Sequence, residues 1–245
     1  MSNFVLDINK INKNLSGYHI LKDVSLKVKE GEIYGFLGPN GAGKTTTMKC
    51  VMDLITPESG SIKIFGEEGL TRKSKQKIGF MPENTYLYKH LTGEEFLKFN
   101  GKFFGLSGEE LDNKIKALLE KVGLTFAKDK YLSEYSKGML QRVGLAQAII
   151  NEPKLVFLDE PMSGLDPIGR KMVKNLIVEL KKSGTTVLFN THILADVESI
   201  CDRISIIHKG EIIVSGEKIK NIDNLENYFI EKVTNTDEEA IKKVE

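Results

Sequence analysis

The sequence predicts an α/β fold with a mixed, mainly parallel sheet, an antiparallel β part at the N-terminus and an inserted α-helical subdomain. Short apolar strand segments alternate with helical segments toward both ends of the chain, which is typical of a parallel sheet covered by helices. Residues 84–150 instead contain three helix-like segments and few strand signals. At about 150 residues per domain, a chain of 245 residues fits one domain with an inserted lobe.

The first predicted elements are strands. Val24, Leu26 and Val28 alternate with polar residues, which is the period-two pattern of a half-buried strand. The continuous apolar run over 33–37 indicates a central strand that is buried on both faces. A glycine-rich loop, a helix over 46–54 and a short strand over 61–65 are expected to follow.

Helices are predicted over 94–104, 109–122 and 138–150. Phe96, Phe99 and Phe103 recur at helical spacing, so we expect them in the core of the helical lobe. After the lobe we expect a helix over 167–182 and four strands, over 155–158, 185–189, 205–208 and 212–214. The charged segment from Thr234 onward is expected to fray.

The predicted organisation has four parts, which differ in their secondary structure. The N-terminal and third parts form the core, the second is the helical subdomain, and the last is a C-terminal helix and tail. Their bounds are 1–83, 84–150, 151–220 and 221–245.

Composition excludes several classes of protein. The formal charge is +1, whereas a dedicated nucleic-acid binder usually has a basic excess, so no nucleic-acid partner is expected. No run of about 18 apolar residues is present, so we expect no membrane span. Cys50 and Cys201 do not make a disulfide framework and fit buried thiols in a reducing cytoplasm.

Residues 38–45 match the pattern G-x-x-x-x-G-K-[ST] of a phosphate loop. Glycines allow successive backbone N–H groups to turn toward phosphate oxygens, and the following helix start adds a favourable dipole. Lys44 is placed to reach the β- and γ-phosphates, and the hydroxyl of Thr45 to bind Mg²⁺. The loop predicts a P-loop NTPase core whose nucleotide-binding residues are Gly38, Pro39, Asn40, Gly41, Ala42, Gly43, Lys44, Thr45 and Thr46.

An apolar strand over 155–158 ends in two acids, Asp159 and Glu160. An acid at the end of a buried strand beside a phosphate loop can hold Mg²⁺, which is the role predicted for Asp159. Glu160 is then placed to polarise a water molecule for attack on the γ-phosphate. Without the phosphate loop, the more common interpretation of such a pair would be two solvated charges at the end of a strand.

These motifs, with three more, resemble the nucleotide-binding subunits of ATP-binding cassette (ABC) transporters over residues 4–232. Residues 132–141, which include Ser136 and Gly138, resemble the signature motif, and residues 163–166 resemble the D-loop that contacts a partner subunit. His192 resembles the switch histidine at the γ-phosphate. Ser136 precedes a helical stretch, so it can act as an N-cap and leave N–H groups as an anion site.

The resemblance is strongest to subunits of ABC-2-type drug, antibiotic or ion exporters. It implies ATP and Mg²⁺ as cofactors and a head-to-tail dimer with a second nucleotide-binding subunit, either identical or different. It also implies an integral membrane permease as partner, a peripheral position on the cytoplasmic face of the cell membrane, and ATP hydrolysis that powers transport. Lys44, Glu160 and His192 are the implied catalytic residues.

Two departures from the family pattern concern the nucleotide. Glu83 replaces the usual glutamine of the family's Q-loop. A carboxylate still binds a hard cation, so Glu83 is a predicted Mg²⁺ ligand with Thr45 and Asp159. The adenine-stacking position falls on Leu15, which lacks an aromatic ring. Tyr18 lies three residues later, and the sequence leaves open whether Tyr18 stacks on adenine or is a surface residue.

Two other functions are considered. A soluble ABC-type ATPase that acts in an assembly process without a permease has no distinguishing motif, so this alternative stays open. A GTPase switch is disfavoured because the guanine-reading pattern N-K-x-D is absent from the sequence.

Overall fold

The computed structural model describes residues 4–83 and 88–242, and the chain forms two compact units. Unit 1 comprises residues up to 71 and from 188 onward, and unit 2 comprises residues 72–187. Strand β8 (Thr186–Thr191) begins in unit 2 and ends in unit 1. The four parts predicted from the sequence follow other boundaries and stay a prediction.

Unit 1 contains an antiparallel sheet with the strand order β2-β1-β4-β5. Leu21, Val24, Leu26 and Val28 are buried while the positions between them face outward, so the predicted alternation is confirmed. Burial of one face of each long strand supplies the hydrophobic driving force for this sheet. The strands are β1 (Phe4–Leu15), β2 (Tyr18–Lys29), β4 (Ser59–Ile64) and β5 (Glu67–Glu68).

The parallel part of unit 1 is built on β3 (Ile33–Leu37), whose five residues are all buried, as predicted. Strand β9 (Arg203–His208) pairs parallel to β3, and β10 (Glu211–Lys218) pairs antiparallel to β9. Packing against β3 is close, because a Cβ built on Gly35 would lie 2.9 Å from Val197 Cγ1 of helix α7. The helices of unit 1 are α1 (Lys44–Val51), α7 (Leu194–Ile200) and α8 (Leu225–Lys242).

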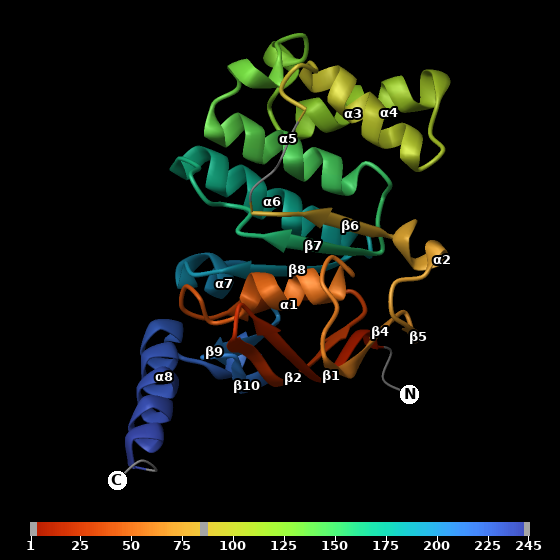
Figure 1. Cartoon of the computed structure of the whole chain (residues 1–245). Coiled ribbons are helices and arrows are strands. Elements are labelled where there is room, and N and C mark those ends of the chain that lie inside the picture. The colour runs from red at the N-terminus through yellow and green to blue at the C-terminus, as the bar shows by residue number, and fades with distance from the viewer. Residues whose placement is uncertain (1–3, 84–87, 243–245) are drawn as a thin grey trace. The chain divides into compact units, whose positions relative to one another are not determined.

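Unit 2 contains a parallel strand pair and the helical lobe (Figure 1). Strand β6 (Ile78–Met81), which the sequence patterns did not single out, pairs with β7 (Leu155–Asp159). The predicted lobe helices are confirmed to within a residue at each end. The helices of unit 2 are α2 (Arg72–Lys75), α3 (Gly93–Phe103), α4 (Gly108–Lys121), α5 (Lys137–Ile149) and α6 (Pro167–Lys182).

The phenylalanine stripe on α3 is only partly in the core of the lobe. Phe96 is buried, but Phe99 and Phe103 are 39% and 67% exposed, so the prediction of three core residues was wrong for these two. Phe99 stacks edge to face on Phe103 and on Tyr88, with ring centroids 4.9 and 5.3 Å apart, respectively. Edge-to-face stacking gives aromatic rings favourable contacts at the surface as well as in a core. Helical spacing alone therefore does not show whether a phenylalanine is buried.

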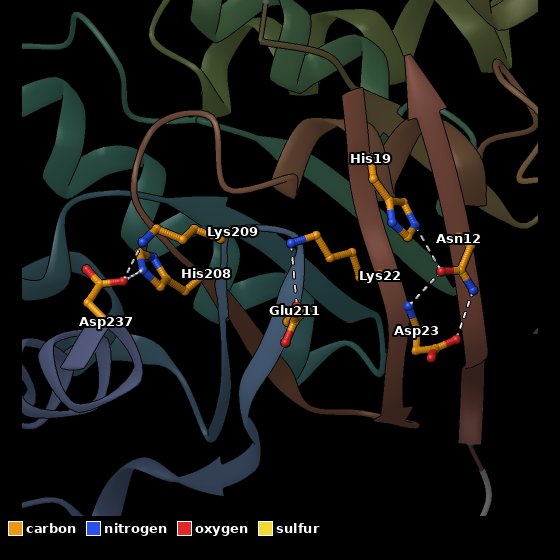
Figure 2. Close-up of polar contacts among 8 residues, drawn as sticks. All are labelled: Asn12, His19, Lys22, Asp23, His208, Lys209, Glu211 and Asp237. Carbon is orange, nitrogen blue, oxygen red and sulfur yellow. Dashed lines mark hydrogen bonds and ion pairs between the residues drawn. The ribbon is translucent and has the colours of Figure 1, made fainter. Parts of the chain in front are cut away.

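Helix α8 continues through the segment that was expected to fray, so that expectation was wrong up to Lys242. The carboxylate of Asp237 accepts hydrogen bonds from Lys209 Nζ and pairs with His208 Nε2, each at 2.7 Å (Figure 2). Long-range polar contacts to the β9–β10 turn thus hold a charged segment that has little helix signal of its own. Within residues 4–83 and 88–242, no helix is long and apolar enough to cross a membrane.

Cys50 and Cys201 are both buried, as the sequence predicts, and neither forms a disulfide within the part of the chain that the structure describes. Burial raises the pKa of the Cys50 thiol to about 11. The thiolate, which is the reactive form, is therefore disfavoured at neutral pH, and Cys50 acts as a small apolar residue.

Candidate functional site

In unit 1, the phosphate loop follows the buried strand β3 and ends at helix α1, as the sequence predicts. Gly38 needs to lack a side chain because a Cβ there would lie 2.3 Å from the carbonyl oxygen of Ile207. Gly43 has a φ of 112°, and a Cβ there would lie 2.8 Å from Leu21 Cδ2. Because both glycines lack a side chain, the loop backbone can lie close against β2 and β9. The positive φ of Gly43 is also a conformation that favours glycine.

Lys44 is the first residue of α1, and its side chain turns back over the loop. Its ammonium donates hydrogen bonds to the carbonyl oxygens of Gly38 at 2.6 Å and of Pro39 at 3.0 Å. The residue is 7% exposed, so this charge lies in a partly desolvated position. A buried cation beside the backbone of the loop is suited to bind a phosphate anion.

The start of α1 has no side-chain cap, since Gly43 occupies the N-cap. The first N–H groups of a helix have no intrahelical acceptor, so an anion is favoured there. Thr45 and Thr46 lie half-buried in this first turn, while Thr47 is buried and donates its hydroxyl to the Gly43 carbonyl at 2.9 Å. Loop residues Asn40 and Gly41 are exposed.

The β1–β2 hairpin reaches its turn at Leu15 and Tyr18, which are opposite each other in the register. Paired residues of antiparallel strands project from the same face, so both side chains lie on one side of the hairpin. Leu15 is 38% exposed and Tyr18 74%. The hairpin is tied to the loop region because Lys22 N donates to Gly210 O and Gly210 N donates to Ala42 O.

His192 follows the last residue of β8 in unit 1 and is exposed. The hydroxyl oxygen of Thr191 accepts a hydrogen bond from Ile193 N at 3.1 Å, which closes a tight turn around His192. His192 therefore lies directly after a strand, as predicted, and its backbone is fixed by the turn.

In unit 2, the two acids lie at the carboxyl end of β7. Asp159 is 1% exposed and Glu160 is 7% exposed. The parallel register pairs Met81 of β6 with Leu158 of β7. Glu83, two residues beyond Met81, therefore comes to the same sheet edge as Asp159 and Glu160, and its side chain is exposed there.

Ser136 is the N-cap of α5, as predicted, and its Oγ accepts a hydrogen bond from Met139 N at 3.2 Å. A Cβ built on Gly138 would lie 3.3 Å from Leu165 Cδ2, so the signature helix starts against residues 163–166. Asp166 caps the next helix, α6, by accepting a hydrogen bond from Gly169 N at 2.7 Å. The signature and D-loop residues are thus neighbours within unit 2.

The sequence analysis did not predict the hydrogen bond between Gln141 and Glu160. Gln141 of α5 is 4% exposed, and its Nε2 donates a hydrogen bond to the backbone carbonyl of Glu160 at 2.7 Å. The residue lies within the stretch that resembles the signature motif, but neither spacing nor residue type indicates its acceptor.

Comparison with known proteins agrees with these observations. The family model described as ABC transporter matches residues 21–163. An ABC transporter ATP-binding protein of Synechocystis sp. is 48% identical over 225 residues, which are 91% of this chain; the chain spans 63% of that relative's length. The linearmycin resistance ATP-binding protein of Bacillus subtilis is 40% identical over 87% of this chain and 70% of its own length.

A solved structure titled as the ATP binding subunit of an ABC transporter superposes with a TM-score of 0.85 at 30% identity, over 94% of this chain and 99% of that one. The chain therefore belongs to the ABC transporter family, as one of its ATP-binding proteins, and has the P-loop NTPase fold that the sequence predicts. Members of this family hydrolyse ATP to power transport, and their ATP-binding subunits pair with membrane components.

Proposed function

We propose that this chain binds ATP with Mg²⁺, dimerises with a second nucleotide-binding subunit and hydrolyses ATP to drive export through a separate membrane permease. The observation that carries the proposal is the position of Lys44, whose buried ammonium lies over the Gly38 and Pro39 carbonyls at the start of α1. Membership of the ABC transporter family supports ATP hydrolysis as the reaction. The motif residues are the proposed site of that reaction.

Residues 38–46 form the proposed phosphate site. Backbone N–H groups of the loop and the first turn of α1 bind phosphate oxygens, and Lys44 binds the β- and γ-phosphates. These donors stabilise the charge that develops on the γ-phosphate during transfer, because they are fixed before the reaction begins.

The donor set is suited to Mg²⁺, since Thr45 offers a hydroxyl and Glu83 and Asp159 offer carboxylates. A site with few carboxylates is suited to a Mg²⁺ ion that keeps water and phosphate ligands. When bound, the ion supplies positive charge beside the β- and γ-phosphates.

Glu160 is the proposed general base. Its carboxylate accepts a proton from the water molecule that attacks the γ-phosphate, and the shielding of the residue from solvent favours proton transfer within the site. His192 is proposed to contact the γ-phosphate from its fixed strand end.

Ser136 and Gly138 are proposed to bind the γ-phosphate of a nucleotide held by the second subunit. The exposed N-cap of α5 supports this role, because a helix start with outward N–H groups attracts anions. Each nucleotide is then shared by two subunits, so binding of ATP closes the dimer and hydrolysis reopens it. Whether the second subunit is identical is left to experiment.

The partner in the membrane is proposed to be an integral permease, with this chain peripheral on the cytoplasmic face. The similarity of this chain to the linearmycin resistance ATP-binding protein supports a role in export. The names of the relatives favour transport over an assembly role without a permease.

The test uses Glu160→Gln in the full chain, with the exposed Glu120→Gln as control. We expect Glu160→Gln to lower kcat at least about 100-fold, because a positioned general base contributes 10²–10⁴-fold, and to accumulate an ATP-bound dimer by size-exclusion chromatography. Unchanged turnover in Glu160→Gln would show that the assigned base is wrong. Copurification of a membrane protein with the tagged chain tests the permease.

A further inference from the structure

We infer that Gln141 is a positioning residue for the catalytic base, because its side-chain amide holds the backbone of Glu160. The inference rests on the proposed role of Glu160 as the general base. It assigns a function to a residue outside the phosphate loop, the metal ligands and the signature Ser136–Gly138 contact.

The backbone of Glu160 needs outside support. Its φ is 51°, a left-handed conformation that is uncommon for residues other than glycine. Pro161 follows it, and a proline further restricts the backbone of the preceding residue. Unfavourable conformations of this kind persist at functional sites only when the surrounding structure holds them in place.

The support acts on the Glu160 carbonyl. Gln141 Nε2 donates to this oxygen at 2.7 Å, and Ser163 N donates to it at 3.1 Å. Pro161 has no N–H, so the carbonyl oxygen is the hydrogen-bonding group of this peptide unit. Two donors on one oxygen fix the peptide plane and, through it, the direction of the Glu160 Cα–Cβ bond.

The two donors differ in where they come from. Ser163 belongs to the turn directly after Glu160, whereas Gln141 lies 19 residues earlier in the chain, on α5. Its 4% exposure means that the hydrogen bond forms away from water, where an unpaired carbonyl oxygen is costly. The Gln141 bond therefore ties the strained turn to a separate rigid element.

The helix that carries Gln141 also carries the proposed phosphate contact of the signature motif. Ser136, its N-cap, precedes Gln141 by five residues, a rise of about 7.5 Å along a helix. A displacement of α5 when its start binds a phosphate is thus passed to the Glu160 backbone through one hydrogen bond. Binding of the second subunit's nucleotide is thereby coupled to the orientation of the Glu160 side chain.

The experiment compares Gln141→Met, which keeps shape but removes the donor, with Gln147→Met as matched control. Gln147 lies on the same helix, is half-buried and has no side-chain hydrogen bond among the residues that the structure describes. We expect Gln141→Met to lower kcat for ATP about 10- to 100-fold, because a small misplacement of a catalytic group has effects of this size. The KM for ATP and the ATP-induced dimer should not change, since the phosphate loop is untouched.

A second variant separates positioning from packing. Gln141→Lys restores a donor that can reach the carbonyl, so its kcat should be nearer to the wild type than that of Gln141→Met. In a Glu160→Gln background, Gln141→Met should cause no further loss, since two residues that act as a unit are not additive. The thermal unfolding midpoint of each variant identifies a variant that fails to fold.

Three outcomes would overturn the inference. Unchanged kcat in Gln141→Met, an equal loss in Gln147→Met, or a Gln141→Lys variant as slow as Gln141→Met each removes the role of the donor. If Glu160→Gln abolishes turnover while Gln141→Met does not lower it, only the role of Gln141 fails. If Glu160→Gln keeps its turnover, the assigned base and the role of Gln141 both fail.

Discussion

Oδ1 of Asp237, on helix α8, lies 2.7 Å from Nε2 of His208 at the end of strand β9 (Figure 2). Lys209 and His208 lower the pKa of Asp237 from its usual 3.8. A lowered pKa in the folded state means that the contribution to stability is present above pH 3.8 and is lost as the pH falls through the folded value. The contact therefore ties α8 to the β9–β10 turn near neutral pH and releases it in acid.

Asp237→Asn tests this contact. We expect a small decrease in the thermal unfolding midpoint at pH 7, because the pair is partly exposed, and faster amide exchange in α8. The decrease should shrink as the pH falls below 3.8 and should be gone once the pH is below the lowered pKa of Asp237. The exposed Asp223→Asn is the control, and equal exchange rates in the two variants would contradict the prediction.

Lys44→Ala should weaken ATP binding by about one to two orders of magnitude. The lost interaction is a charge-assisted hydrogen bond from a buried ammonium, which contributes about 1.5–3 kcal/mol. Isothermal titration calorimetry measures the affinity, and Lys49→Ala, an exposed lysine of the same helix, is the control. An unaltered affinity in Lys44→Ala would remove the proposed phosphate site.

Tyr18→Ala tests which side chain contacts the base. Tyr18 and Leu15 project from the same face of the hairpin, so we expect the exposed ring of Tyr18 to stack on adenine. Loss of the ring should weaken ATP binding about tenfold, since stacking contributes about 1–3 kcal/mol per base, while Tyr18→Phe should bind like the wild type. Equal affinities of Tyr18→Ala and Tyr18→Phe would show that Tyr18 is a surface residue.

Gly79→Ala should destabilise unit 2. A Cβ on Gly79 of β6 would lie 1.8 Å from the carbonyl oxygen of Ala148, so α5 and β6 touch backbone to backbone. Relieving this clash requires a shift of the signature helix, at a cost of about 1–3 kcal/mol. Denaturant unfolding measures the loss, and an unchanged unfolding midpoint would contradict the packing described here.

Local sequence predicted most secondary structure. Helix α6 (Pro167–Lys182) was predicted with its observed bounds, because Asp166 is a favourable N-cap and Pro167 suits the first helical position. Strand β3 and the phosphate loop were likewise predicted, since a buried apolar run and a glycine pattern are signals within a few residues. The family resemblance was also carried by such short motifs, in their order along the chain.

Contacts between distant residues could not be predicted in this way. Gln141 and Glu160 are 19 residues apart and His208 and Asp237 are 29 apart, and neither pair has a signal in its spacing. Phe99 and Phe103 share a helical face with the buried Phe96, yet they are exposed, and Phe99 stacks on Phe103 and on Tyr88 of the preceding loop.

The sequence by itself therefore determined the fold class, the family and the residues of the motifs, because each depends on conformational preferences along a short stretch of chain. The tertiary structure decided how the Glu160 backbone is held, that α8 continues past Thr234 and which face of α3 is buried. Those features depend on free energies of packing and hydrogen bonding between segments that meet only after the chain has folded.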